Sequence, residues 1–138
     1  MAGHHAEVFL HFVWTTHGRE PILTSEIERR LFRYITGICT KLNCHVLALN
    51  GMPDHVHLAI TFPTTVTIEH VIRTIKGSSS TFARETLVPG KFFGWRDGYG
   101  VFSFGRQDVD AVIAYIRNQK THHSEGSLWP ELERLDPD

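Results

Sequence analysis

The sequence predicts an α+β fold in which helices pack on one face of an antiparallel sheet. Strand-like and helix-like apolar periodicities alternate along the chain, and Gly, Pro or Asn separates several of the segments. The predicted order of strand, helix, strand, strand, helix, strand and helix matches the ferredoxin-like group, with one added C-terminal helix. A chain of 138 residues with 41% hydrophobic content is long enough for one globular domain, residues 1–138, with a real core.

The first strand and the first helix are expected within residues 7–42. Residues 7–16 are apolar and aromatic in an almost continuous run, which predicts a central strand. His11 lies in the middle of this run and could face either the core or a site. Ser25 and Glu28 have the spacing of a capping box, which predicts a helix that reaches about Leu42. The solvated face of this helix would carry three arginines, Arg29, Arg30 and Arg33.

The next two strands are expected to form a hairpin. Residues 44–49 predict the second strand, and Asn50-Gly51 predicts the tight turn into the third. The third strand contains His55 and His57, whose imidazoles point the same way because residues two apart on a strand share a face. Neutral imidazole is a common metal ligand, but one such pair among ten histidines has little specificity. Asp54, just before them, would either orient an imidazole or serve as a turn residue.

The second helix and the segment after it combine small, basic and aromatic residues. Thr67 is the expected cap of this helix, and its continuation at residues 76–81 is rich in small hydroxyl side chains. Such a segment suits close approach to a phosphate, and a helix break at Gly77 would explain it equally well. Residues 91–106 interleave aromatic with basic side chains, which suits either a groove for single strands or a core. Two of these aromatic residues are expected to be exposed, Trp95 and Tyr99.

The last predicted helix spans residues 108–123. Its apolar residues recur at helical spacing, and Asp108 is a plausible N-cap. Tyr115, Gln119 and His122 follow one another along one edge of this helix. A tyrosine phenol can act as a nucleophile, and a Gln oxygen is an acceptable ligand for a hard cation. With the two strand histidines, the chain offers three candidate metal ligands and one candidate nucleophile.

This combination resembles the single-tyrosine HUH transposases, which move small insertion sequences as single-stranded DNA. The resemblance covers nearly the whole chain, through HFVWTTHGREPIL, GMPDHVHLAI, VIRTIKGSSSTF, FGWRDGYGVFSFG and YIRNQKTHH in that order. It implies that His55, His57 and Gln119 bind Mg²⁺ or Mn²⁺, although the nitrogen ligands alone would also suit Zn²⁺ or Ni²⁺. It also implies that Tyr115 is the nucleophile and forms a 5′-phosphotyrosine; His122 is a candidate acceptor of its proton. The REP-associated tyrosine transposases are close relatives that share these residues.

The resemblance implies excision and insertion of a mobile element by cleavage and rejoining of single-stranded DNA, whose ends would form hairpins. It also implies a homodimer, in which the tyrosine helix completes either its own site or that of the partner. The candidate DNA-binding residues are Lys76, Trp95, Arg96, Tyr99, Arg117 and Lys120. Two alternatives stay open: a non-catalytic module that binds single-stranded nucleic acid, and a metal-dependent phosphodiesterase in which water attacks.

The net charge of the chain is −1, which is unusual for a nucleic-acid-binding protein. The charge is unevenly distributed: residues 61–120 hold eight Lys or Arg against five acidic residues, and residues 121–138 hold one against five. A basic body is therefore followed by an acidic tail, residues 124–138. The chain has no long apolar run and no signal-peptide pattern, and its two cysteines are expected to be reduced, so we expect a cytoplasmic protein. The resemblance implies that it is prokaryotic.

Overall fold

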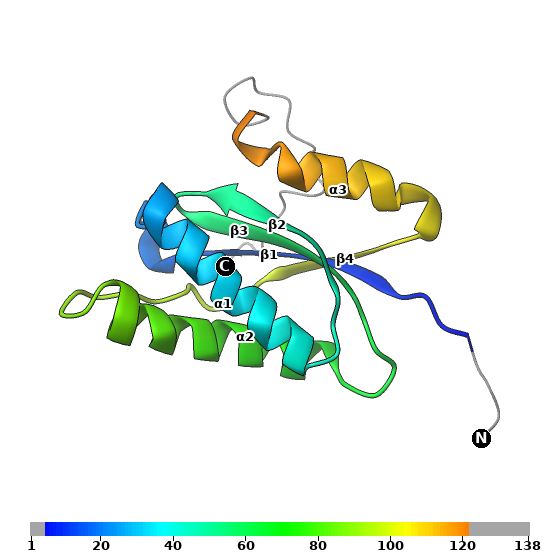
Figure 1. Ribbon diagram of the computed structural model, residues 1–138, viewed down its shortest axis with the longest axis horizontal. Coiled ribbons are helices and arrows are strands. Elements are labelled where there is room, and N and C mark those ends of the chain that lie inside the picture. Colours follow the sequence, from blue (N-terminus) through cyan, green and yellow to red (C-terminus); the bar gives the residue numbers. More distant parts are fainter. Residues whose placement is uncertain (1–4, 122–138) are drawn as a thin grey trace.

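The structure, a computed structural model, describes residues 5–121 and is built on a four-stranded antiparallel sheet. The strands are β1 (Phe9–Thr15), β2 (Val46–Met52), β3 (His55–Thr61) and β4 (Gly100–Phe104). Helix α1 (Ser25–Lys41) connects β1 to β2, helix α2 (Ile68–Phe82) lies between β3 and β4, and α3 (Val109–Arg117) follows β4 (Figure 1). The strand order β2-β3-β1-β4 is that of the ferredoxin-like group, so the predicted fold class is confirmed.

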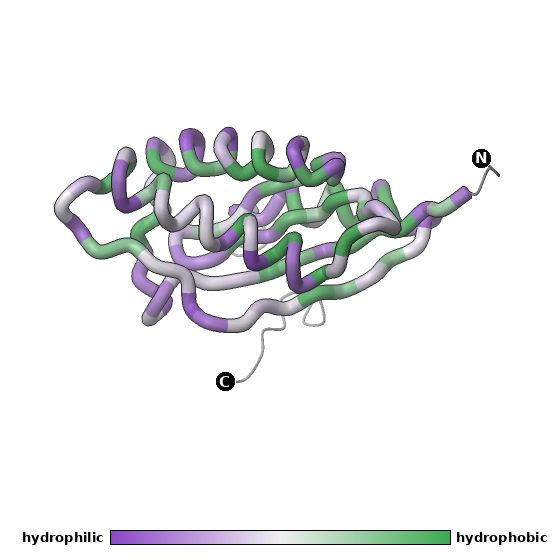
Figure 2. The backbone as a smooth tube through the Cα atoms, turned by 90° about the horizontal axis from the view of Figure 1, so that it is seen from below, coloured by the Kyte–Doolittle hydropathy of each residue, from purple (hydrophilic) through white to green (hydrophobic). Residues whose placement is uncertain are grey.

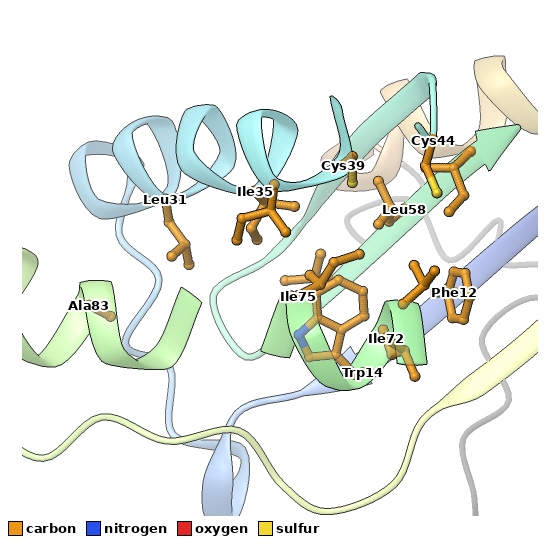
Figure 3. Packing of buried hydrophobic residues seen from close by; sticks show 14 of the residues in the cluster. Phe12, Trp14, Leu31, Ile35, Cys39, Cys44, Leu58, Ile72, Ile75 and Ala83 are labelled. Carbon is orange, nitrogen blue, oxygen red and sulfur yellow. The ribbon is translucent and has the colours of Figure 1, made fainter. Parts of the chain in front are cut away.

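The main core lies between one face of the sheet and the helices α1 and α2 (Figure 3). Alternate residues of β1, including Phe12 and Trp14, are completely buried there, and Leu31 and Ile35 meet them from α1. Apolar and polar residues alternate along both helices, as expected for helices that cover one face of a sheet (Figure 2). Cys39 is buried in the same core, and this burial raises the pKa of its thiol to about 12.

Helix α3 packs on the opposite face of the sheet, against β2 and β3 (Figure 1). A second, smaller cluster joins the helix to the strands, and its buried members are Ala48, Ala59, Val112, Tyr115 and Ile116. His11, His55 and His57 occupy strand positions that alternate with the core residues, so they belong to this same face. The helix that carries the tyrosine therefore lies on the sheet of its own chain.

One prediction about helix boundaries is wrong, and one of two alternatives is excluded. The N-cap of α1 is Thr24 rather than Ser25, and its side chain accepts a hydrogen bond from the Ile27 N–H at 3.4 Å. Thr24 can act as the N-cap because its side chain, like that of Ser25, carries a hydroxyl oxygen that accepts a hydrogen bond. Gly77 does not break α2, which continues to Phe82 and then into a π-helical turn. Gly77 is exposed, and a single exposed glycine only weakens a helix.

The predicted turn at Asn50-Gly51 is also wrong, because both residues belong to β2. The chain reverses at Pro53 and Asp54 instead. Residue 51 must be a glycine because its backbone lies very close to that of β3: a Cβ atom on it would lie 2.1 Å from the carbonyl oxygen of His55. The glycine thus allows β2 to approach the start of the histidine strand closely.

Within residues 5–121, no helix is long and apolar enough to cross a membrane. His122 and the acidic tail, residues 124–138, lie outside the described residues.

Candidate active site

The two strand histidines form a rigid, buried pair. His55 is 4% exposed and His57 is completely buried, and their ring centroids are 5.2 Å apart. Strand β3 is paired on both sides, so that His57 lies opposite Val13 of β1 and Asn50 of β2. The backbone ladders on either side therefore fix where these imidazoles lie.

Asp54 orients the first of these imidazoles. One oxygen of its carboxylate lies 2.8 Å from His55 Nδ1, and the other accepts a hydrogen bond from Arg19 Nε at 3.1 Å. Burial alone would raise the pKa of Asp54, but the hydrogen bonds and charges of His55 and Arg19 lower it overall. An ionised carboxylate only accepts, so His55 must donate from Nδ1, and its lone pair then lies on Nε2. Asp54 is therefore both a turn residue and the partner of His55.

His57 has a different partner, supplied by β1. His11 Nε2 lies 2.9 Å from His57 Nδ1, and both side chains are completely buried. Residue 11 pairs with Ala59 across the strands, so the two histidines meet diagonally on the face that also carries α3. Of the two positions that the sequence left open for His11, the structure shows the one that faces the site.

Tyr115 lies directly beside the histidine pair. Its ring centroid is 6.2 Å from that of His57, at an interplanar angle of 81°. The side chain is 2% exposed and packs in the small cluster between α3 and the sheet.

Helix α3 stops at Arg117, and a one-residue turn at Asn118 separates it from residues 119–121, which are helical again, so the predicted single helix edge is interrupted before Gln119. Gln119 is nevertheless completely buried. Asn50 Nδ2 donates to the Arg117 carbonyl at 2.9 Å, and Lys120 Nζ donates to Asn50 Oδ1 at 2.9 Å. Asn50 lies on β2, directly opposite His57 of β3. These two bonds therefore attach the segment that contains Gln119 to β2 at the level of His57.

The donor set of this region fits a divalent cation. In the part of the chain that the structure describes, no three His, Cys, Asp or Glu side chains are grouped to hold a metal ion. His55 and His57 would supply two imidazole nitrogens to such a cation, and the resemblance to the HUH transposases implies the Gln119 oxygen as the third protein ligand. Two nitrogens and one neutral oxygen leave coordination positions open, which is typical of a catalytic rather than a structural site.

A second feature is a basic cavity of about 470 Å³ between α2 and residues 94–99. Four cations line it, together with two of the aromatic residues named from the sequence: Arg73, Lys76, Arg84, Arg96, Trp95 and Tyr99. The cavity adjoins α2, whereas Tyr115 lies on the other face of the sheet. The cavity and the histidine site are therefore separate.

Two of the candidate DNA-binding residues, Lys76 and Trp95, make hydrogen bonds within the protein. Lys76 Nζ donates to the carbonyl oxygens of Arg96 and Gly98 at 2.8 and 2.7 Å, and burial lowers the pKa of Lys76. Trp95 Nε1 donates to Ser79 Oγ at 3.0 Å.

The expected exposure of Trp95 and Tyr99 is wrong, because both are partly buried and pack against the main core. Trp95 meets Trp14 edge to face, with ring centroids 5.8 Å apart, and Tyr99 lies 6.1 Å from Phe12. The apolar surface of these rings is more stable inside the protein than in water.

Comparisons with known proteins agree with the motifs and with the fold. A curated relative, the ISDra2 transposase TnpA of Deinococcus radiodurans, is 24% identical over 114 residues, which are 79% of this chain and 81% of the relative. The crystal structure of a candidate transposase from Deinococcus radiodurans R1 matches with a TM-score of 0.71 and 24% identity, over 86% of this chain and 95% of that chain. A REP-associated tyrosine transposase bound to a REP hairpin matches with a TM-score of 0.62 and 16% identity, over 94% and 81% of the two chains. The family model of the IS200-like transposases matches residues 5–119, and this chain therefore belongs to that family of tyrosine transposases.

Proposed function

We propose that this protein cleaves and rejoins single-stranded DNA, with Tyr115 as the nucleophile, to excise and insert a small mobile element. The observation that carries this proposal is the position of Tyr115, whose ring lies 6.2 Å from that of His57 on the face of the sheet that also carries His55. The proposal also uses two imidazoles, those of His55 and His57 on β3, and the buried amide of Gln119, which follows α3 in the chain. A core without chemical function would not require this polar set.

The reaction follows from the chemistry of a phenol and a phosphodiester. Tyr115 Oη attacks phosphorus in line, the new O–P bond forms, and the bond from phosphorus to the 3′ oxygen breaks. The phenol loses its proton, and the leaving 3′ oxygen gains one and becomes a hydroxyl. The product is a 5′-phosphotyrosine, which keeps the energy of the broken ester. Attack by another 3′ hydroxyl on this ester joins new strands and restores the phenol without ATP.

Three side chains would support this step by holding a divalent cation, Mg²⁺ or Mn²⁺. His55 and His57 would bind it through Nε2, and Gln119 through its side-chain oxygen. Such a cation, when bound, polarises the phosphate and stabilises the charge that develops during attack. His122 stays a candidate acceptor of the phenol proton.

The proposed partner is single-stranded DNA from the ends of the element, in part folded into hairpins. Support comes from the REP-associated relative, which is bound to a REP hairpin, and from the basic cavity beside α2. We also propose a homodimer, in which the tyrosine helix acts on its own site or on that of the partner. The packing of α3 on its own sheet favours the first arrangement.

The decisive experiment mixes the protein with single-stranded oligonucleotides from the element ends and Mn²⁺, followed by a denaturing gel. We expect a DNA band that is shifted by the mass of one protein and that disappears with Tyr115→Phe or with EDTA. Tyr34→Phe is the matched control, because Tyr34 is an exposed tyrosine of α1 that stacks on Phe82, away from the site.

Two other outcomes would contradict the proposal. Cleavage that persists in Tyr115→Phe would assign the attack to water and make the protein a phosphodiesterase. Binding of the correct DNA ends without any cleavage would make it a non-catalytic binding module.

A further inference from the structure

The hydrogen bond between His11 and His57 determines which ring nitrogen of His57 carries the proton. The two facing nitrogens, His11 Nε2 and His57 Nδ1, are 2.9 Å apart, so one ring donates and the other accepts. If His57 donates from Nδ1, its lone pair lies on Nε2 and is directed away from His11. If His11 donates instead, His57 carries its proton on Nε2 and cannot bind a cation there. Only the first arrangement is compatible with a metal-binding His57.

We propose that His11 is a positioning residue that holds His57 in the Nδ1–H tautomer, so that His57 Nε2 is ready to bind a divalent cation. This inference rests on the proposed function, because the tautomer matters only if His57 is a ligand. The arrangement parallels that of His55, whose Nδ1 lies 2.8 Å from a carboxylate oxygen of Asp54. Each imidazole of the pair thus has its own partner at Nδ1.

The two partners differ in a way that burial explains. The side chain of Asp54 is 27% exposed, so water and Arg19 can stabilise its negative charge. His11 and His57 are completely buried on the face of the sheet that also carries α3, where an ionised carboxylate would be costly. A neutral imidazole supplies one acceptor nitrogen at that depth without adding a charge. The strand pairing of β1 with β3 fixes the distance between the two rings.

The first test needs no substitution. In the metal-free native protein, ¹⁵N NMR of the labelled imidazoles distinguishes a protonated from an unprotonated nitrogen at each position. We expect His57 to be protonated at Nδ1 and His11 to be unprotonated at Nε2. A native His57 that is protonated at Nε2 would overturn the proposal.

The second test compares two substitutions of the same residue. His11→Gln keeps an acceptor oxygen at about the reach of Nε2, whereas His11→Phe keeps a flat ring but has no acceptor. Mn²⁺ titration should show affinity about 10–100-fold weaker for His11→Phe, the usual effect of losing the partner of a metal-binding histidine. His11→Gln should recover most of that loss, and the NMR signature of His57 should change only in the Phe variant.

The proposal is overturned if His11→Phe folds, binds Mn²⁺ as tightly as the native protein and leaves the tautomer of His57 unchanged. It is also overturned if the Gln and Phe variants lose Mn²⁺ binding equally while both keep the native melting temperature. Failure of the proposed function is distinguishable from these results, because the tautomer is measured without DNA and without metal. If the native protein shows the expected tautomer but forms no DNA adduct, the proposed role of His11 stands and only the proposed cleavage of DNA is contradicted.

Discussion

Gly51 is the residue at which the backbone of β2 comes closest to the histidine strand. A Cβ atom there would lie 2.1 Å from the carbonyl oxygen of His55 and 3.1 Å from the Cα of Val56. These contacts are with backbone, which cannot rotate away as a flexible side chain can. The absence of a side chain at Gly51 therefore helps to determine the position of His55.

We expect Gly51→Ala to destabilise the fold by about 1–3 kcal/mol, the usual cost of overpacking a buried position. It should also abolish the covalent DNA adduct, because the start of β3 must shift to admit the methyl group. Thermal unfolding and the denaturing gel measure the two effects. The matched control is Gly37→Ala in α1, where a Cβ meets nothing within 4 Å, and we expect it to stabilise the helix by about 0.5–1 kcal/mol. A Gly51→Ala variant with native stability and native adduct formation would contradict this account.

At the scale of elements, Lys120 ties the segment after α3 to two other parts of the chain. Its Nζ lies 3.1 Å from both carboxylate oxygens of Glu28 on α1, and it donates to Asn50 Oδ1 and to the Gly51 carbonyl. The sequence predicted that Lys120 binds DNA, and this network offers a different role. The lysine anchors the end of the tyrosine helix against the sheet.

The substitution Lys120→Met separates these two roles, because it removes the charge and keeps the apolar stem. If Lys120 is an anchor, amide hydrogen exchange in residues 109–117 should become faster, and global stability should fall by no more than about 1 kcal/mol, because the lysine is half exposed. Lys91→Met is the control, because Lys91 is an exposed lysine outside this network. Unchanged exchange in α3 together with weaker DNA binding would instead support a direct role in binding DNA.

The elements and their faces could be predicted from the sequence because apolar periodicity records which side of a strand or helix is buried. The turn before β3 could not be predicted from the sequence. Asn50-Gly51 is a stronger hairpin signal than Pro53-Asp54, but here Gly51 lies within β2 and allows its backbone to approach that of His55 closely. The end of α3 at Arg117 was also missed, because helical spacing continues through Gln119 in the sequence. These errors concern boundaries, and they leave the order of elements intact.

The part of the site that was predicted consists of residues whose chemistry is apparent from their type, such as the paired histidines and the tyrosine. The position of His11 was left open, because a polar residue inside an apolar strand has no periodic signal of its own. Its contact with His57 depends on which strands are neighbours and on their register, and neither can be read from local sequence. The same limit applies to Asp54, whose two roles are distinguished only by three-dimensional contacts.

At the scale of the whole molecule, the sheet separates two chemically different faces. Figure 1 shows α3 on one side of the sheet and α2 on the other. Tyr115 packs between α3 and the face of the sheet that carries His55 and His57, and the basic cavity adjoins α2. Two acidic residues, Glu69 and Asp97, also line the cavity, so its four cations outnumber its acidic residues by two, whereas the whole chain carries a net charge of −1. Binding of the DNA backbone and cleavage of one phosphodiester can therefore depend on different residues.

The double substitution of Arg73 and Arg96 by Ala tests this separation. We expect weaker binding of single-stranded DNA and a shallower fall of affinity with salt, by about 0.7 in the log–log slope for each phosphate that the variant no longer neutralises. At saturating DNA, the yield of the covalent adduct should stay near that of the native protein, because neither arginine lies on the face of Tyr115. Fluorescence anisotropy at several salt concentrations and the denaturing gel provide the two measurements.

The matched control replaces Arg30 and Arg33, two exposed arginines of α1 that do not line the cavity. Both double variants change the net charge by the same amount, so a purely long-range attraction would weaken DNA binding equally in the two. Direct binding of phosphate in the cavity predicts weaker DNA binding only for the cavity pair. Equal weakening would mean that the cavity is not a DNA site, and disappearance of the adduct at saturating DNA would mean that the two faces are not independent.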